Sequence, residues 1–181
     1  MGNWYYLMSQ LPSVSVTSER TPLPVTEEYF MELCSRFLDS KSLKVLKELS
    51  LEPPKDKKKT GSAFLDSWYE NERMLRFALA KIRSIKLKKD VEFPMLSISP
   101  DIVQTARTAC GMESPLAAEQ FLNEARMQML DRFAPFDQFS TDAVYVYALK
   151  LKLAQRMKSF TEEAGAASYR TIYDQILGES K

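Results

Sequence analysis

The sequence contains no histidine, only two cysteines and only five glycines in 181 residues. The absence of histidine removes the commonest general base and the commonest protein ligand for transition metals. The five glycines are too far apart to form a phosphate-binding loop or a dinucleotide-binding fingerprint. We therefore expect no zinc, haem or nucleotide site, no bound cofactor and no enzyme activity.

Long apolar runs are also missing. No stretch approaches the roughly 18 consecutive apolar residues that span a bilayer. The first ten residues lack the basic lead-in and the long apolar region of a secretory signal. We therefore expect a cytoplasmic protein. Cys34 and Cys110 each fall on the apolar side of an expected helix, which predicts two buried, free thiols.

The composition that remains is typical of a globular, helical chain, with 45% hydrophobic and 11% aromatic residues. We predict an all-α fold of five to seven helices organised around one long helix. The chain is expected to form two small lobes, 1–90 and 91–181, or one continuous domain. Helical periodicity and capping residues predict helices over 27–38, about 40–49, 62–89, 100–110, 115–133, 141–160 and 167–177.

The segment 62–89 gives the strongest helix signal in the chain. It contains neither glycine nor proline, and Ser62 can cap its first turn. A helix of this length extends for roughly 40 Å. Its apolar residues recur at three- and four-residue steps, as expected for one buried face: Leu65, Trp68, Leu75, Leu79 and Ile82.

One acidic residue, Glu72, interrupts that apolar face, and Arg76 follows one turn later. Two interpretations are open at this stage. The pair forms a weak ion pair at the edge of the helix, or Glu72 is a charge held at an interface with a partner protein.

Two further segments carry less direct signals. Residues 141–160 alternate in a way that suits a strand, but their length and their Ala, Leu, Lys, Gln and Met content favour a helix. Residues 3–16 fit either a turn of helix or an extended arm. Within them Trp4, Tyr5, Tyr6 and Leu7 are costly to leave in water, so we expect them to be docked.

The last predicted helix, 167–177, presents an apolar stripe. Its members recur at helical spacing, and we expect them to face inward: Tyr169, Ile172, Tyr173 and Ile176.

Charge is divided unevenly along a chain whose net charge is only +1. Residues 1–90 carry 16 basic and 12 acidic side chains, whereas residues 91–181 carry 9 basic and 12 acidic side chains. Basic residues gather at the end of the long helix. Such runs are usually solvated faces, but with nearby aromatic residues they also suit a nucleic-acid surface.

Four motifs, in order along the chain, resemble a small bacterial family encoded beside V-type ATPase subunits. Residues 5–12 resemble its Y-Y-L-x-x-x-L-P opening, and residues 30–34 resemble its F-x-E-L-C signature. In the long helix, Trp68-Tyr69-Glu70, Leu75-Arg76, Leu79-Ala80 and Arg83 are similar to its aromatic, E-x-x-L-R and L-A segment. Residues 147–151 with Arg156 resemble its Y-A-L-K-L-x-x-x-x-R helix.

This resemblance implies a non-catalytic structural subunit or accessory of a bacterial V-type ATPase, a rotary ion-translocating machine. In character the chain is similar to the helical connector of the central stalk in such ATPases. The implied partners are the stalk and membrane-ring subunits, with no small-molecule substrate, and the implied location is the inner face of the cell membrane. The expected contact residues are Arg76, Arg83, Lys86, Lys88 and Lys89. The alternative function is a helical nucleic-acid-binding module that uses the basic end of 62–89.

Overall fold

The computed structural model of the protein describes residues 4–14, 22–56, 59–89, 97–159 and 162–179. This part of the chain forms eight α-helices and no strand, so the predicted all-α class is confirmed. The number of helices exceeds the predicted maximum of seven by one, because the N-terminal segment 3–16, for which no single structure was predicted, contains a short helix. The helices are α1 (Trp4–Gln10), α2 (Glu27–Phe37), α3 (Ser40–Glu48), α4 (Ala63–Lys86), α5 (Pro100–Gly111), α6 (Pro115–Phe133), α7 (Thr141–Ser159) and α8 (Glu162–Glu179).

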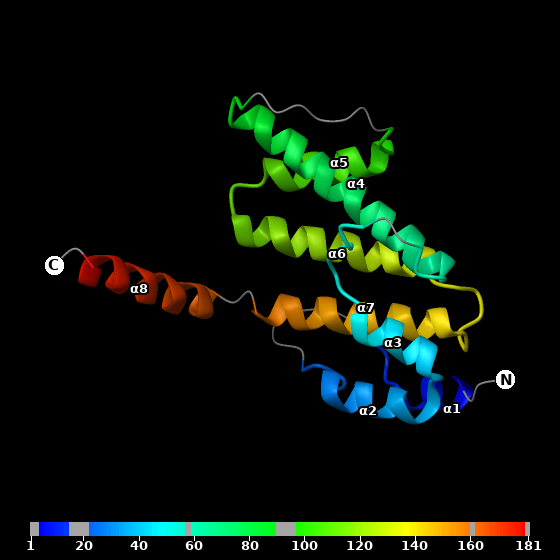
Figure 1. Cartoon of the computed structure of the whole chain (residues 1–181). Helices are drawn as coiled ribbons and strands as arrows, with labels where there is room; N and C mark the ends of the chain where they lie inside the picture. The colour runs from blue at the N-terminus through cyan, green and yellow to red at the C-terminus, as the bar shows by residue number, and fades with distance from the viewer. Residues whose placement is uncertain (1–3, 15–21, 57–58, 90–96, 160–161, 180–181) are drawn as a thin grey trace.

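The helices are stacked in successive layers (Figure 1). The pair α4 and α5 packs on α6, α6 packs on α7, and the helices α1–α3 lie on the other side of α7. One cluster of buried side chains joins α7 to α1–α3 and to the first half of α4. A second cluster joins the second half of α4 to α5 and α6. The predicted lobe boundary at residues 90 and 91 lies outside the described residues, so the division into lobes stays a prediction.

The helix predicted for 141–160 is confirmed as α7, and its surroundings explain its ambiguous pattern. Seven successive residues, 143–149, are buried. Because other helices cover α7 on several sides, its sequence shows no single apolar stripe. Its first turn is capped by the hydroxyl of Ser140, which accepts from the Ala143 N–H at 3.2 Å.

The predicted cap of the long helix is also confirmed. The Ser62 hydroxyl accepts a hydrogen bond from the Leu65 N–H at 3.1 Å and donates one to Asp142 of α7 at 2.7 Å. The helix ends at Lys86, three residues earlier than predicted. Lys88 and Lys89 therefore follow the helix, and Lys88 adopts a left-handed conformation with φ 50°.

The expectation that the N-terminal aromatic residues are docked is correct only in part. Leu7 is fully buried and Trp4 is half-buried, but Tyr5 and Tyr6 are 60% and 59% exposed. The helix α1 is only seven residues long and packs mainly on α2, so it buries a single face. The Tyr5 ring instead lies beside Phe139, with ring centroids 4.8 Å apart.

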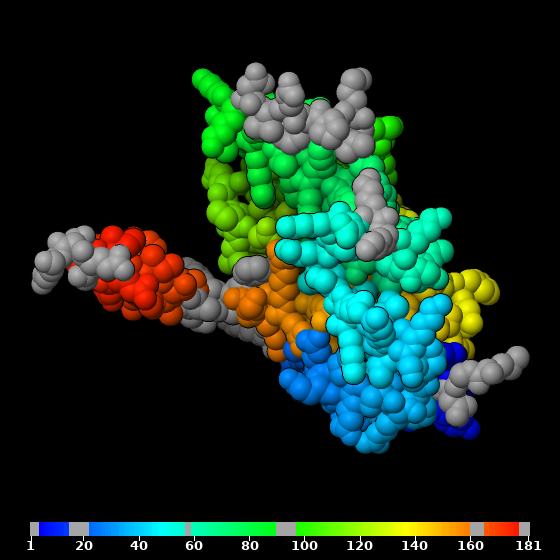
Figure 2. Space-filling model, viewed as in Figure 1, coloured from blue at the N-terminus to red at the C-terminus, as the bar shows by residue number. Residues whose placement is uncertain are grey.

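The predicted last helix exists, but its predicted inward face is wrong. The helix α8 is longer than expected, and all of its described side chains, at 165–177, are exposed. It continues past the end of α7 and stands away from the packed helices (Figures 1 and 2). The misassigned residues are Tyr169, Ile172, Tyr173 and Ile176, which are between 52% and 68% exposed.

None of the described helices is both long enough and apolar enough to cross a membrane. A cytoplasmic or membrane-peripheral location stays a prediction.

The two cysteines are free thiols in different environments. Cys34 is fully buried among α2 and its neighbours, whereas Cys110 near the end of α5 is half-buried. The prediction of a buried thiol is therefore confirmed for Cys34. It is confirmed only in part for Cys110. Desolvation raises the pKa of the Cys34 thiol to about 12.

We expect the native protein to be alkylated at Cys110 well before Cys34. At pH 8 a thiol with a pKa of about 12 is ionised in only about one molecule in 10⁴, and only the thiolate reacts. Mass spectrometry of the protein after short exposure to iodoacetamide checks this order, and denaturant should abolish the difference. Equal labelling rates in the native state would contradict the burial of Cys34.

Candidate functional site

A charged pair lies inside the molecule where α4 and α6 meet. Glu72 is fully buried and Arg126 is only 5% exposed. The Arg126 guanidinium donates to both carboxylate oxygens of Glu72, with its Nε 3.0 Å from Oε2 and its Nη2 3.0 Å from Oε1. Its Nη1 donates to the Asn123 side-chain oxygen at 3.3 Å. Two charges are thus removed from water together, and each is satisfied by the other.

The ion pair predicted between Glu72 and Arg76 is confirmed, but both interpretations placed Glu72 wrongly. The residue lies neither at a helix edge nor at an external interface, because its charge is directed into the protein toward Arg126. Arg76 does form the predicted ion pair, with its Nε 2.8 Å from Glu72 Oε1. That contact is therefore one part of a buried network and not a weak surface pair.

The sequence of each helix taken alone could not reveal that Arg126 pairs with Glu72, because the two residues are 54 positions apart. One signal did exist. Leu122, Arg126 and Leu130 follow one another at four-residue steps, so the arginine occupies the buried face of α6 between two fully buried leucines. A charge at such a position requires an opposite charge on a neighbouring helix.

Arg76 differs from the other four expected contact residues. Its side chain is 36% exposed and lies between Glu72 and Glu52, whose Oε1 is 3.4 Å from the Arg76 Nη1. Burial lowers the pKa of Arg76, but hydrogen bonding to Glu72 and the charges of Glu72 and Glu52 raise it more, so the net shift is upward. Its charge is thus largely used within the chain.

The other four form an exposed basic end of α4, defined here as Arg83, Lys86, Lys88 and Lys89. Lys86 donates to the Cys110 carbonyl, which ties this end to the end of α5. Two aliphatic side chains, Ile85 and Leu87, lie among the cations, and each is 67% exposed. A partner contact at these residues stays a prediction, but the structure does group the four of them.

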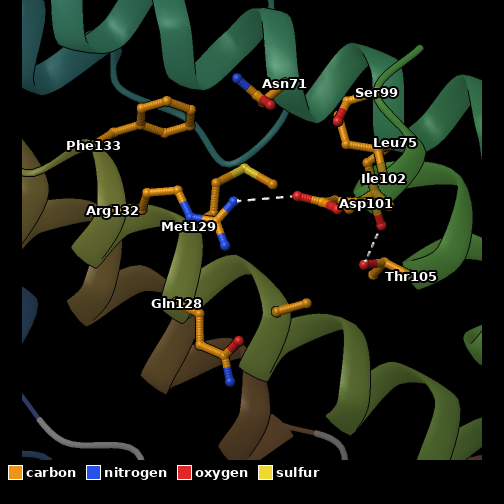
Figure 3. Close-up of a pocket in the computed structure, with 11 residues that line it drawn as sticks. Asn71, Leu75, Ser99, Asp101, Ile102, Thr105, Gln128, Met129, Arg132 and Phe133 are labelled. Carbon is orange, nitrogen blue, oxygen red and sulfur yellow. Dashed lines mark hydrogen bonds and ion pairs between the residues drawn. The ribbon is translucent and has the colours of Figure 1, made fainter.

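A small cavity opens between α4, α5 and α6 (Figure 3). Its volume of about 120 Å³ holds a few water molecules, well below the roughly 300 Å³ or more of typical ligand sites. Asp101 and Arg132 approach across it to 3.8 Å, and the Thr105 hydroxyl donates to the Asp101 carbonyl at 2.9 Å. The cavity therefore carries one charge of each sign.

Two larger hollows, of about 340 and 480 Å³, lie beside Tyr147 and Tyr69 respectively. Burial raises the pKa of Tyr147 to about 12 and also raises that of Tyr69. Neither phenol therefore provides a base near neutral pH. Within the described ranges, no three Cys, Asp or Glu residues are placed to hold a metal ion. The absence of a cofactor and of enzyme activity stays a prediction.

Comparison of the chain with protein-family models, with curated proteins and with solved structures found no match. The buried network and the exposed basic end of α4 are therefore interpreted from their own chemistry.

We expect Glu72→Gln to destabilise the protein strongly. The change leaves the Arg126 charge buried without a counter-charge, and breaking such pairs costs about 3–5 kcal/mol. Urea unfolding followed by circular dichroism measures the effect. Glu124→Gln, an exposed position on α6, serves as the matched control and should change stability by less than about 0.5 kcal/mol.

The double variant Glu72→Met/Arg126→Met should recover much of the lost stability, because it removes both buried charges at once. If Glu72→Gln unfolds at the same urea concentration as the wild type, the pair does not constrain the fold.

Proposed function

We propose that this protein is a non-catalytic structural subunit or accessory of a bacterial V-type ATPase that connects or stabilises the central stalk. The observation that carries the proposal is the exposed basic end of α4, where four cations are grouped at the end of the longest helix. The four ordered motifs that resemble the ATPase-associated family support the choice of partner.

The position of α4 suits a mechanical role. Its first half contributes Leu65 and Trp68 to one core cluster, and its second half contributes Leu75 and Leu79 to the other. The ion pair from Glu72 fixes it to α6 between those two regions. We infer that the fold is organised around this helix, and that a force applied at its basic end reaches both clusters.

Cations at the end of a stiff helix favour an acidic partner surface, because opposite potentials steer association and fix orientation. In this proposal the partners are the stalk and membrane-ring subunits of the ATPase. The contact is made by Arg83, Lys86, Lys88 and Lys89. Arg76 stabilises the helix that carries them through its ion pair with Glu72. The protein then lies at the inner face of the membrane through the complex and has no chemistry of its own.

The second candidate, a nucleic-acid-binding module, is favoured by the same grouped cations. It differs in one measurable property. Binding through phosphate contacts releases counterions, so affinity for DNA or RNA falls steeply as salt rises.

An affinity pull-down of the tagged chain from gently solubilised native membranes tests the proposal. We expect stalk and ring subunits in a fixed ratio by mass spectrometry, and we expect Arg83→Glu/Lys89→Glu to lose most of them. Lys41→Glu/Lys44→Glu, which reverses two exposed charges on α3, is the matched control and should retain them.

Recovery of nucleic acid or ribosomal proteins without ATPase subunits would rule out the connector and favour the second candidate. Equal recovery with the α4 variant and with the α3 control would remove the basic end from the interface.

A further inference from the structure

The exposed basic end of α4 carries charge that the described residues do not neutralise. From residue 73 to residue 89 the sequence contains seven basic residues and no acidic one. The first two form ion pairs earlier in α4, but within the described ranges no ion pair reaches the basic end. Lys86 donates to the Cys110 carbonyl, a neutral acceptor that leaves its charge uncompensated. The next residue in the chain, Asp90, lies outside the described residues.

Two aliphatic side chains are interleaved with these cations. Ile85 and Leu87 are each 67% exposed, with Lys86 between them and Lys88 after them. Apolar side chains surrounded by cations are typical of segments that bind at the interface of an anionic bilayer, which offers an apolar layer beneath its phosphates. A nucleic acid offers phosphates without that layer, and its bases stack on aromatic side chains. Residues 78–89 include no aromatic side chain, so the composition favours lipid.

The turn that ends α4 keeps a lysine where glycine is favoured. The Lys88 N–H donates to the Ile85 carbonyl at 3.1 Å, and the Lys89 N–H donates to the Ser84 carbonyl at 3.0 Å. This pair of hydrogen bonds defines a Schellman motif, whose left-handed residue is usually glycine. Here that residue is Lys88, with φ 50°. Strained conformations of this kind cluster where a side chain has a function, so the motif favours a role for Lys88 outside the fold.

We propose that the exposed basic end of α4, together with Ile85 and Leu87, binds the surface of a membrane that contains anionic lipids. The two aliphatic side chains enter the boundary between headgroups and acyl chains, and the four cations contact the lipid phosphates. The end of α4 lies at the edge of the molecule remote from α1–α3 (Figure 1), so those helices do not cover it. The inference goes beyond the proposed function, because it requires no ATPase subunit.

Co-sedimentation of the full chain with vesicles of phosphatidylglycerol and phosphatidylcholine tests the proposal, with vesicles of phosphatidylcholine alone as the uncharged reference. Each cation near an anionic surface raises the partition coefficient roughly five-fold, so Arg83→Gln/Lys89→Gln should weaken binding about 25-fold. The matched control, Lys41→Gln/Lys44→Gln, removes the same charge from exposed positions of α3 and should bind like the wild type. Thermal unfolding followed by circular dichroism checks that both variants fold.

The variant Lys88→Gly separates the function of the lysine from its cost to the fold. Glycine adopts the left-handed conformation without strain, so the melting temperature should rise by roughly 2–4 °C. The loss of one charge should lower binding to the anionic vesicles roughly five-fold at the same time. A stabilised variant that binds with unchanged affinity removes Lys88 from the surface.

The aliphatic pair distinguishes lipid from nucleic acid. Ile85→Ser/Leu87→Ser keeps every charge and should weaken vesicle binding about ten-fold, because it removes the apolar contact. It should leave any binding to a duplex DNA oligonucleotide unchanged. Wild-type binding to that oligonucleotide that is tighter than binding to the vesicles at the same salt concentration would assign the surface to nucleic acid and overturn the proposal.

The absence of binding to the anionic vesicles also overturns it, as does equal binding to vesicles of phosphatidylcholine alone. An Arg83→Gln/Lys89→Gln variant that binds normally excludes the basic end of α4 from the contact. The vesicle assay contains no other protein, so its failure is distinguishable from a failed pull-down of ATPase subunits.

Discussion

The arrangement of α4 on α6 depends on burying Glu72 and Arg126 together. A carboxylate with no exposed surface is tolerated only where an opposite charge and hydrogen bonds replace water, and the Arg126 guanidinium supplies both. Trp68 precedes Glu72 in one core cluster and Leu75 follows it in the other. Sliding α4 by one turn would leave both charges unpaired, so we expect the pair to specify the register of the two helices.

This constraint also decides which charges remain for contacts outside the chain. Arg76 is one turn from Glu72 and is drawn into the network, whereas Arg83 and the lysines beyond it are too far along α4 to reach it. The basic end therefore follows from the geometry of the interior. Two core clusters share α4, and one ion pair fixes the helix to α6 between them.

Local signals in the sequence predicted the helices well and their environments less well. The cap predicted at Ser62 accepts the expected backbone hydrogen bond, and the hydroxyls of Thr26 and Ser114 cap α2 and α6 in the same way. Periodicity identifies an apolar face but not what covers it, which is why α8 was wrongly expected to pack inward. The partner of Glu72 was missed for a related reason: the spacing of Leu122, Arg126 and Leu130 marks Arg126 as buried, but only the tertiary fold brings it to Glu72.

Glu72 and the apolar stripe on α8 both depart from the usual pattern of apolar residues inside and polar residues outside. The structure accommodates them in different ways. Glu72 is a polar residue on an apolar face, and the chain compensates for it internally with Arg126. The stripe on α8 is apolar surface left in water, and the described packing provides no compensation for it. Natural sequences break local rules mainly where function or assembly requires it. An exception that is resolved inside the molecule therefore explains the fold, whereas the described packing does not explain the exposed stripe on α8.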